Sequence, residues 1–208
     1  MPHAQANAPV GVVLAGGANR RFGSPKGLAR VGGVRIVDRV AAALRATTPD
    51  LLLVSNAADA AAWLPGVPTI GDAVPGGGGL SGVHAALLHT RRSVLVVAWD
   101  MPFVSAALLG ELARRRASEH ADACFPESPS PVGLEPFCAC YAPSCLRALE
   151  DALAAGRTGG AQFAHSLPHP SWLRAPDVAA IGDPARLFLS VNTAADLAGA
   201  EAMCRDPL

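Results

Sequence analysis

Short apolar runs alternate with amphipathic segments along most of the chain. Runs rich in branched aliphatic and aromatic residues predict strands at residues 10–14, 51–54, 68–70, 93–98, 121–125 and 136–141. Segments with a helical pattern predict helices at residues 36–45, 57–64, 81–89, 105–116, 144–155 and 194–203, with Ser81 and Ser105 as N-caps of the third and fourth. Because strands and helices alternate, we expect an α/β fold in which a mainly parallel sheet carries helices on both faces.

The loop after the first predicted strand is rich in glycine and positive charge. Parallel sheets bind ligands at the carboxyl ends of their strands, and this loop lies at such an end. Glycines expose consecutive backbone N–H groups to an anion, and arginine or lysine adds full positive charge. The loop therefore favours a nucleotide phosphate site over a simple chain turn, on the basis of Gly16, Gly17, Arg20, Arg21, Gly23 and Lys26.

Two common phosphate-binding signatures are absent from this loop. A P-loop requires Gly-x-x-x-x-Gly-Lys-Ser/Thr, but Lys26 is followed by Gly27 and lacks the preceding glycine spacing. The dinucleotide fingerprint Gly-x-Gly-x-x-Gly is also missing, because the next glycine after Gly17 is Gly23. The second absence argues against an NAD(P)-dependent oxidoreductase.

An acidic residue follows the apolar run at 93–98. In Val97-Ala-Trp-Asp-Met-Pro-Phe103, Pro102 prevents the strand from continuing, so Asp100 is predicted at the same rim as the glycine loop. A Mg²⁺ ion that bridges nucleotide phosphates needs only one or two protein carboxylates. Asp100 is thus a candidate metal ligand, and the alternative is an aspartate that caps the helix starting near Ser105.

Composition narrows the remaining classes. Half of the 208 residues are hydrophobic, but no apolar run approaches the roughly 20 residues of a membrane span, and the N-terminus lacks secretory features. The formal net charge is zero and the arginines are dispersed, which argues against nucleic-acid binding. The cysteines form no Cys-x-x-Cys motif, so we expect reduced core thiols in a cytoplasmic protein rather than a metal or redox site: Cys124, Cys138, Cys140, Cys145 and Cys204.

The glycine loop resembles the Leu-Ala-Gly-Gly-x-x-x-Arg-Met-Gly-x-x-Lys signature of molybdenum cofactor guanylyltransferases. Phe22 replaces the usual methionine and Pro25 replaces an acidic residue, while sugar-phosphate and cytidylyl transferases share most of the signature. The residues that match in place are Leu14, Ala15, Gly16, Gly17, Arg21, Gly23 and Lys26.

Further segments extend the resemblance in family order. Asp100 stands where the family carries its magnesium-binding Asp-x-Pro-Tyr/Phe, and Asp72 where it has a nucleotide-contacting aspartate. Gly79 replaces a usual proline in the glycine-rich segment 71–87. The 190–197 segment is similar to Asn-x-Asn-Thr-Pro-Glu-Asp-Leu and includes Asn192, with Thr193 as an alternative helix cap. A family asparagine near residue 55 matches either Ser55 or Asn56, and Glu135-Pro-Phe lies on the side expected to meet the pterin.

The resemblance implies a Rossmann-like, three-layer nucleotidyltransferase fold. It implies a single domain over residues 1–208, with a nucleotide half at about 10–103 and an acceptor half at about 104–203. The implied reaction joins GTP to molybdopterin with Mg²⁺ as cofactor and releases pyrophosphate. Proteins that deliver molybdopterin are further candidate partners. The implied catalytic residues are Arg21, Lys26 and Asp100, and the implied nucleotide-binding residues are Leu14, Ala15, Gly16, Gly17, Lys26, Asn56, Asp72 and Asp100.

Two alternatives stay open beside this interpretation. The first is a cytidylyltransferase or sugar-phosphate nucleotidyltransferase of the same fold. Gly16 favours guanine over cytosine, because cytidylyl relatives carry alanine there and the missing methyl leaves room for a purine. The second is a non-catalytic nucleotide-binding relative, which the changes at Phe22, Pro25 and Gly79 keep open. His84, His165 and His169 are expected to pack or lie at the surface rather than bind ligands.

Overall fold

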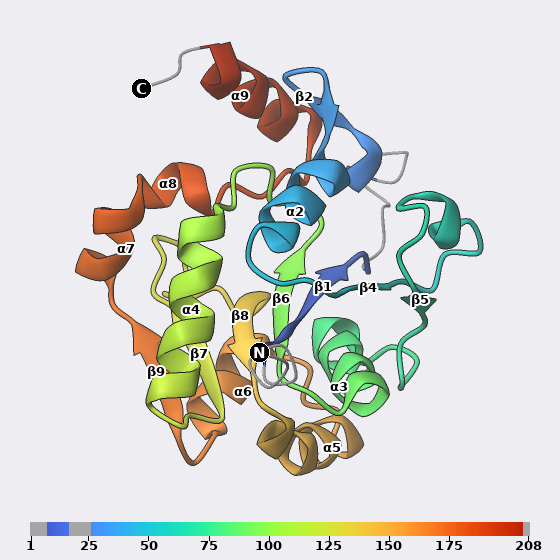
Figure 1. The fold of residues 1–208 in the computed structure, drawn as a ribbon, viewed down its shortest axis with the longest axis vertical. Helices are drawn as coiled ribbons and strands as arrows, with labels where there is room; N and C mark the ends of the chain where they lie inside the picture. Colours follow the sequence, from blue (N-terminus) through green and yellow to red (C-terminus); the bar gives the residue numbers. More distant parts are fainter. Residues whose placement is uncertain (1–7, 17–25, 206–208) are drawn as a thin grey trace.

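One seven-stranded sheet organises the computed structural model, which describes residues 8–16 and 26–205. Its strand order is β5-β4-β1-β6-β8-β7-β9, and all strands run in the same direction except β8 (Figure 1). The predicted α/β fold with a mainly parallel sheet is therefore confirmed. The strands are β1 (Val10–Leu14), β4 (Leu51–Val54), β5 (Thr69–Ile70), β6 (Val94–Ala98), β7 (Ala123–Pro126), β8 (Cys138–Tyr141) and β9 (Pro170–Leu173).

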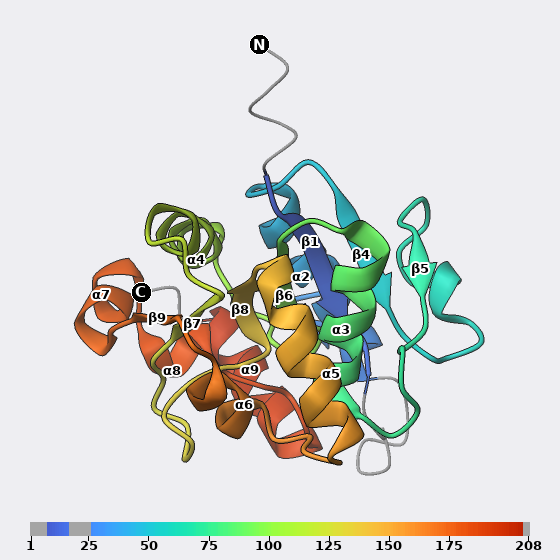
Figure 2. The same cartoon turned by 90° about the horizontal axis from the view of Figure 1, so that it is seen from below.

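Helices cover both faces of the sheet, as predicted. In β1, Val13 faces a core that includes Leu44 and Leu108, whereas Val12 faces a second core that includes Leu87 and Leu149. Figure 2 shows α3 and α5 together on the second side, away from α4. The helices are α2 (Ile36–Arg45), α3 (Gly78–Thr90), α4 (Ala106–Ser118), α5 (Leu146–Ala154), α6 (Gly160–Ser166), α7 (Ala175–Ile181), α8 (Pro184–Leu187) and α9 (Ala194–Arg205).

Two local predictions need correction. The expected helix at 57–64 is only a 3₁₀ turn, Ala60–Ala62. Ser81 is not an N-cap, because α3 already begins at Gly78 and the Ser81 hydroxyl lies inside the helix. There it donates to the Val74 carbonyl (2.8 Å) and accepts from the Val74 N–H (2.7 Å), so it ties the glycine-rich loop to the helix. Ser105 does cap α4, accepting from the Leu108 N–H at 3.2 Å.

Several short elements were not predicted. They are the hairpin β2 (Arg30–Val31) and β3 (Val34–Arg35), together with α6, β9, α7 and α8. Their apolar patterns are too short for a periodic signal. The hairpin lies beside α9, where the Gly32 N–H donates to the Glu201 carboxylate at 3.0 Å (Figure 1). The end of the chain is thereby joined to the segment that follows the glycine loop.

The cysteines are free thiols, and four of the five are buried. Cys138 and Cys140 face the same core from β8, as the alternation predicts. Burial raises the pKa of Cys124 to about 11 and that of Cys140 to about 12, so both stay protonated and unreactive near neutral pH. Among the described residues, no helix is long and apolar enough to cross a membrane.

Candidate active site

The carboxyl ends of the central strands surround one cavity. Leu14 pairs in register with Val54 on one side and with Ala98 on the other, so the loops after β1, β4 and β6 leave the sheet together. The cavity between them has a volume of about 220 Å³. It brings predicted site residues from distant parts of the sequence together and is lined by Leu14, Gly16, Val54, Asp72, Gly78, Gly79, Gly82, Ala98, Asp100 and Phe137.

Lys26 and Asp100 form an ion pair at this rim. The Lys26 ammonium donates to the Asp100 carboxylate and, at 2.7 Å, to the amide oxygen of Asn192. The Lys26 and Asp100 side chains are only 16% and 10% exposed, so the pair is shielded from most of the solvent. Two oxygen acceptors thus converge on one cation. Asn192 in turn is held by Ser190, whose hydroxyl accepts from the Asn192 amide at 2.9 Å.

Tight backbone packing fixes the ion pair. Gly27, next to Lys26, lies against the Trp99 ring, where a Cβ would come within 2.2 Å of a ring carbon. Trp99 is buried, stacks on Trp63 at 4.8 Å between ring centroids, and donates its backbone N–H to the Leu14 carbonyl at 3.0 Å. Only glycine at position 27 therefore lets Lys26 sit this close to the end of β6.

A second polar pair lies on the other side of the cavity. The Asn56 amide donates to the Asp72 carboxylate, and the Asp72 N–H donates to the Asn56 amide oxygen, both at 2.8 Å. Burial raises the pKa of Asp72, and the bond from Asn56 partly opposes the shift. Ser55 is buried and donates to the Ala15 carbonyl at 3.0 Å. Of the two alternatives, Ser55 thus supports the loop and exposed Asn56 is available to a ligand.

The glycine at position 79 has a structural partner. A Cβ on Gly79 would lie 2.4 Å from the Phe137 ring, which fills the space beside the first turn of α3. A proline, usual in the family, would collide with the same ring. The departure at Gly79 is therefore matched by a bulky residue across the cavity, and the close approach of α3 to β8 requires the missing side chain.

A half-buried carboxyl lies beyond Phe137. Glu135 accepts a hydrogen bond from the Ser128 hydroxyl at 2.9 Å. Burial raises the pKa of Glu135, the bonds from Ser128 and Ser130 oppose the shift, and the Asp100 charge adds to it. Glu135 does not itself line the cavity, but it lies two residues before Phe137, which does. Sequence reasoning had noted the segment but assigned the side chain no role.

The remaining candidates are of two kinds: some lie outside the described residues, and the histidines do not line the cavity. Gly17 and Arg21, with Phe22 and Pro25, lie outside the described residues. His84 is buried in α3, where neither ring nitrogen has a hydrogen-bond partner among the described residues, and its Nε2 lies 3.8 Å from the Glu150 carboxylate. His165 stacks on Trp172 at 5.0 Å between ring centroids.

Comparison with known proteins gives the same assignment as the motifs. The model of a protein family described as "MobA-like NTP transferase domain" matches residues 11–170. A relative from Pelotomaculum thermopropionicum, named "probable molybdenum cofactor guanylyltransferase", is 34% identical and covers 94% of this chain and 93% of its own. One of the same name from Chloroflexus aggregans is 37% identical and covers 90% of each chain.

One solved structure gives the same grouping. The crystal structure of molybdopterin-guanine dinucleotide biosynthesis protein A from Archaeoglobus fulgidus superposes with a TM-score of 0.80 at 28% identity, covering 94% of this chain and 98% of that one. Fold, ordered motifs and relatives over nearly the whole length agree. This chain belongs to the MobA-like NTP transferases and, among them, to the molybdenum cofactor guanylyltransferase family.

Proposed function

We propose that this protein is a guanylyltransferase that joins the GMP part of GTP to molybdopterin and releases pyrophosphate. The observation that carries the proposal is the meeting of Lys26, Asp100 and Asn192 at the mouth of the strand-end cavity. Family membership supplies the substrate pair, since relatives over 90% or more of the chain bear the name molybdenum cofactor guanylyltransferase.

The reaction is a displacement at phosphorus. A terminal phosphate oxygen of molybdopterin forms a bond to the α-phosphorus of GTP, and the bond from that phosphorus to the bridging oxygen breaks. The electron pair leaves with pyrophosphate. A phosphate nucleophile is already ionised near neutral pH, so no general base is needed. The protein's task is to align two anionic reactants and offset their charge.

Lys26 is suited to that electrostatic role. Its ammonium is held at one point by Asp100 and Asn192, so little reorganisation is needed when a phosphate oxygen arrives. We assign Lys26 to the triphosphate of GTP. Arg21 and the backbone N–H groups of residues 15–17 complete this proposed phosphate site on the strength of the family signature.

The donor set at Asp100 fits Mg²⁺. A carboxylate and an amide oxygen, from Asp100 and Asn192, already converge on one cation, and oxygen ligands of these kinds are those that Mg²⁺ takes. Asp100 would hold the ion, and Asn192 lies close enough to that carboxylate to assist. When bound, Mg²⁺ offsets negative charge on phosphate oxygens.

The two sides of the cavity divide the substrates. Asn56 and Asp72 present an amide and a carboxylate next to Gly16, and together they offer donors and acceptors to the nucleoside of GTP. Phe137 lines the opposite side, next to β8, and we assign that side and the neighbouring Glu135 to the pterin.

A pyrophosphate-release assay tests the proposal. Purified protein is incubated with Mg²⁺ and each nucleoside triphosphate in turn, with and without molybdopterin. We expect release only with GTP and molybdopterin together, and loss of release in Asp100→Ala. Release with CTP or with a sugar phosphate would favour the alternative transferases, and no release with any pair would favour a nucleotide-binding relative.

A further inference from the structure

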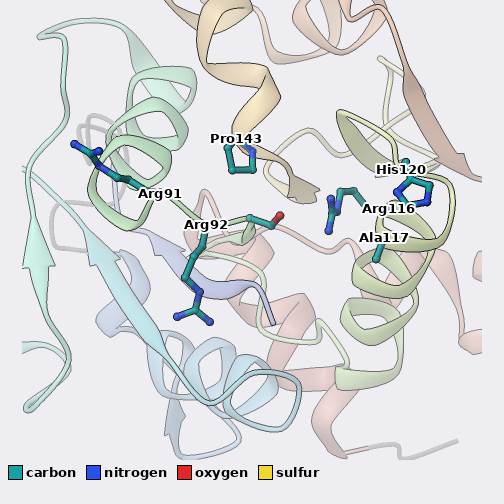
Figure 3. A pocket seen from close by; sticks show the side chains of 7 residues that line it. Arg91, Arg92, Arg116, Ala117, His120 and Pro143 are labelled. Atoms are coloured by element: carbon teal, nitrogen blue, oxygen red, sulfur yellow. The ribbon is translucent and has the colours of Figure 1, made fainter. Parts of the chain in front are cut away.

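A second pocket lies at the opposite rim of the sheet from the active site. Ser93, which precedes β6, lines this pocket, whereas Asp100, which follows β6, lines the active-site cavity. Its volume is about 450 Å³, within the range of small-molecule sites. It is lined by Arg91, Arg92, Ser93, Arg116, Ala117, His120 and Pro143 (Figure 3).

Two arginines of this pocket have incomplete hydrogen bonding. Arg92 donates one terminal nitrogen to Asp50 and the other to the Ala8 carbonyl, both at 2.6 Å, yet its buried Nε has no partner among the described residues. The Nε of Arg116 is likewise buried and without a partner there. Buried N–H groups are nearly always satisfied in folded proteins, so two such donors at one pocket point to an absent acceptor.

The charge of the pocket is also unbalanced. Asp50 offsets Arg92, but within the described chain neither Arg116 nor Arg91 forms an ion pair with a carboxylate. Figure 3 shows the Arg116 side chain pointing from α4 into the pocket, toward the side where Arg92 lies, while Arg91 extends outward. A guanidinium that is partly withdrawn from water and unpaired favours a bound anion.

Backbone conformation marks the same place. Arg91 and His120 have φ angles of 52° and 51°, and they are the two non-glycine residues with positive φ in the part of the chain that the structure describes. Arg91 ends α3, and His120 lies just after α4. Glycine adopts this conformation with less strain, yet both positions carry cationic or titratable side chains that line the pocket. A left-handed residue commonly ends a helix, so this conformation explains how the two side chains come to line the pocket.

We propose that this pocket binds the phosphate group of a small molecule, at a site separate from the active-site cavity. A tetrahedral oxyanion accepts hydrogen bonds from several directions, which suits donors that come from both α4 and the Arg91–Ser93 segment. A planar carboxylate matches one arginine fork only. Because the pocket exceeds the size of phosphate alone, the ligand carries further atoms. This inference does not depend on the proposed transferase reaction.

Calorimetric titration with inorganic phosphate, in a chloride buffer of fixed ionic strength, tests the proposal. The proteins are the wild type, Arg116→Gln, Lys26→Ala as an active-site variant, and Arg147→Gln as a control for an exposed arginine on α5. We expect saturable binding that persists in Lys26→Ala and Arg147→Gln and weakens at least tenfold, or about 1.4 kcal/mol, in Arg116→Gln. Acetate should not compete, whereas pyrophosphate and GMP report whether a diphosphate or a nucleotide fills the pocket better.

A second variant tests the pocket even if Arg116→Gln disturbs the fold. Ala117 is exposed at the pocket, so Ala117→Glu places a negative charge there without removing an internal contact. It should abolish the Lys26-independent phosphate binding while leaving the melting temperature near that of the wild type. Three results would overturn the proposal. The wild type shows no saturable phosphate binding, or Lys26→Ala is the one variant that loses it. The third is that Arg147→Gln weakens phosphate binding as much as Arg116→Gln does.

Discussion

Replacing Gly16 by alanine tests the proposed basis of guanine selectivity. Gly16 lines the active-site cavity, and a Cβ built on it meets no atom of the described residues within 4 Å. The change should therefore cost the folded protein nothing sterically, and by restricting the unfolded chain it should stabilise by about 0.4–1 kcal/mol. Any loss of function must then come from the methyl group meeting the ligand.

The expected effect on selectivity follows from that contact. An added methyl that collides with a purine costs about 1–3 kcal/mol, which corresponds to about a 5- to 150-fold change in a ratio of rates. We expect kcat/KM for GTP, relative to CTP, to fall by a factor in this range in Gly16→Ala. The assay measures pyrophosphate release with both nucleotides in both proteins, because selectivity is a difference of affinities.

Gly110→Ala is the matched control. Gly110 also meets no atom within 4 Å but lies in the middle of α4, remote from the cavity, so alanine there should stabilise the helix and leave the ratio of rates unchanged. An unaltered GTP-to-CTP ratio in Gly16→Ala, with a normal melting curve, would refute the argument. So would a wild-type protein that prefers CTP.

Three further changes probe the site. Lys26→Ala should lower transfer and Lys26→Arg should not restore it fully, because a planar guanidinium fits a different phosphate geometry; unchanged GTP affinity and turnover in Lys26→Ala would reject the phosphate assignment. Gly79→Ala should lower the free energy of unfolding by about 1–3 kcal/mol through its contact with Phe137. In denaturant melts, adding Phe137→Leu should recover part of that loss, whereas strictly additive effects of the two changes on stability would disprove the contact. Burial raises the pKa of Glu135, so the folded protein binds more protons than the unfolded chain, and stability falls as pH rises from the unfolded value of 4.5 through the folded pKa. The melting temperature of Glu135→Gln relative to wild type should therefore be higher at pH 7 than at pH 4, and a difference that does not change with pH would contradict this.

Sequence patterning predicted the parts of the fold that have strong periodicity. β1, β4 and α2 have the predicted limits, since each is a continuous apolar run or a clear amphipathic helix. The start of α3 was predicted three residues late, because glycines at 78 and 79 read as a loop. Gly79 lies in the first turn of α3 with its Cα close to the Phe137 ring, a tertiary contact that no local propensity reports.

In the candidate site, too, some residues could be placed from the sequence and others only from tertiary structure. Asp72, Asn56 and Asp100 each follow a predicted strand, so the topology alone placed them at one rim. Glu135 and Phe137 precede β8, the antiparallel strand. Phe137 lines the cavity because β8 runs opposite to β6, so that its first residues lie beside the last residues of β6. A pattern of apolar residues predicts a strand but carries no sign of its direction. The family resemblance alone therefore placed this segment on the pterin side, and the antiparallel direction of β8 is visible only in the structure.

The register of the central sheet explains why the charged residues meet at all. Side chains of β6 alternate between two cores, with Leu95 and Val97 on one face and Val94 and Val96 on the other. A slip of one residue would exchange these faces and displace Asp100 along the strand direction by about 3.3 Å. The cores therefore determine where Asp100 stands. The Val191 N–H then donates to the Asp100 carbonyl at 2.9 Å, which sets Asn192 beside it. Apolar packing in the two cores thus positions the ion pair between Lys26 and Asp100, which are 74 positions apart in the sequence. The chemistry of this pair depends on core residues that do not belong to it.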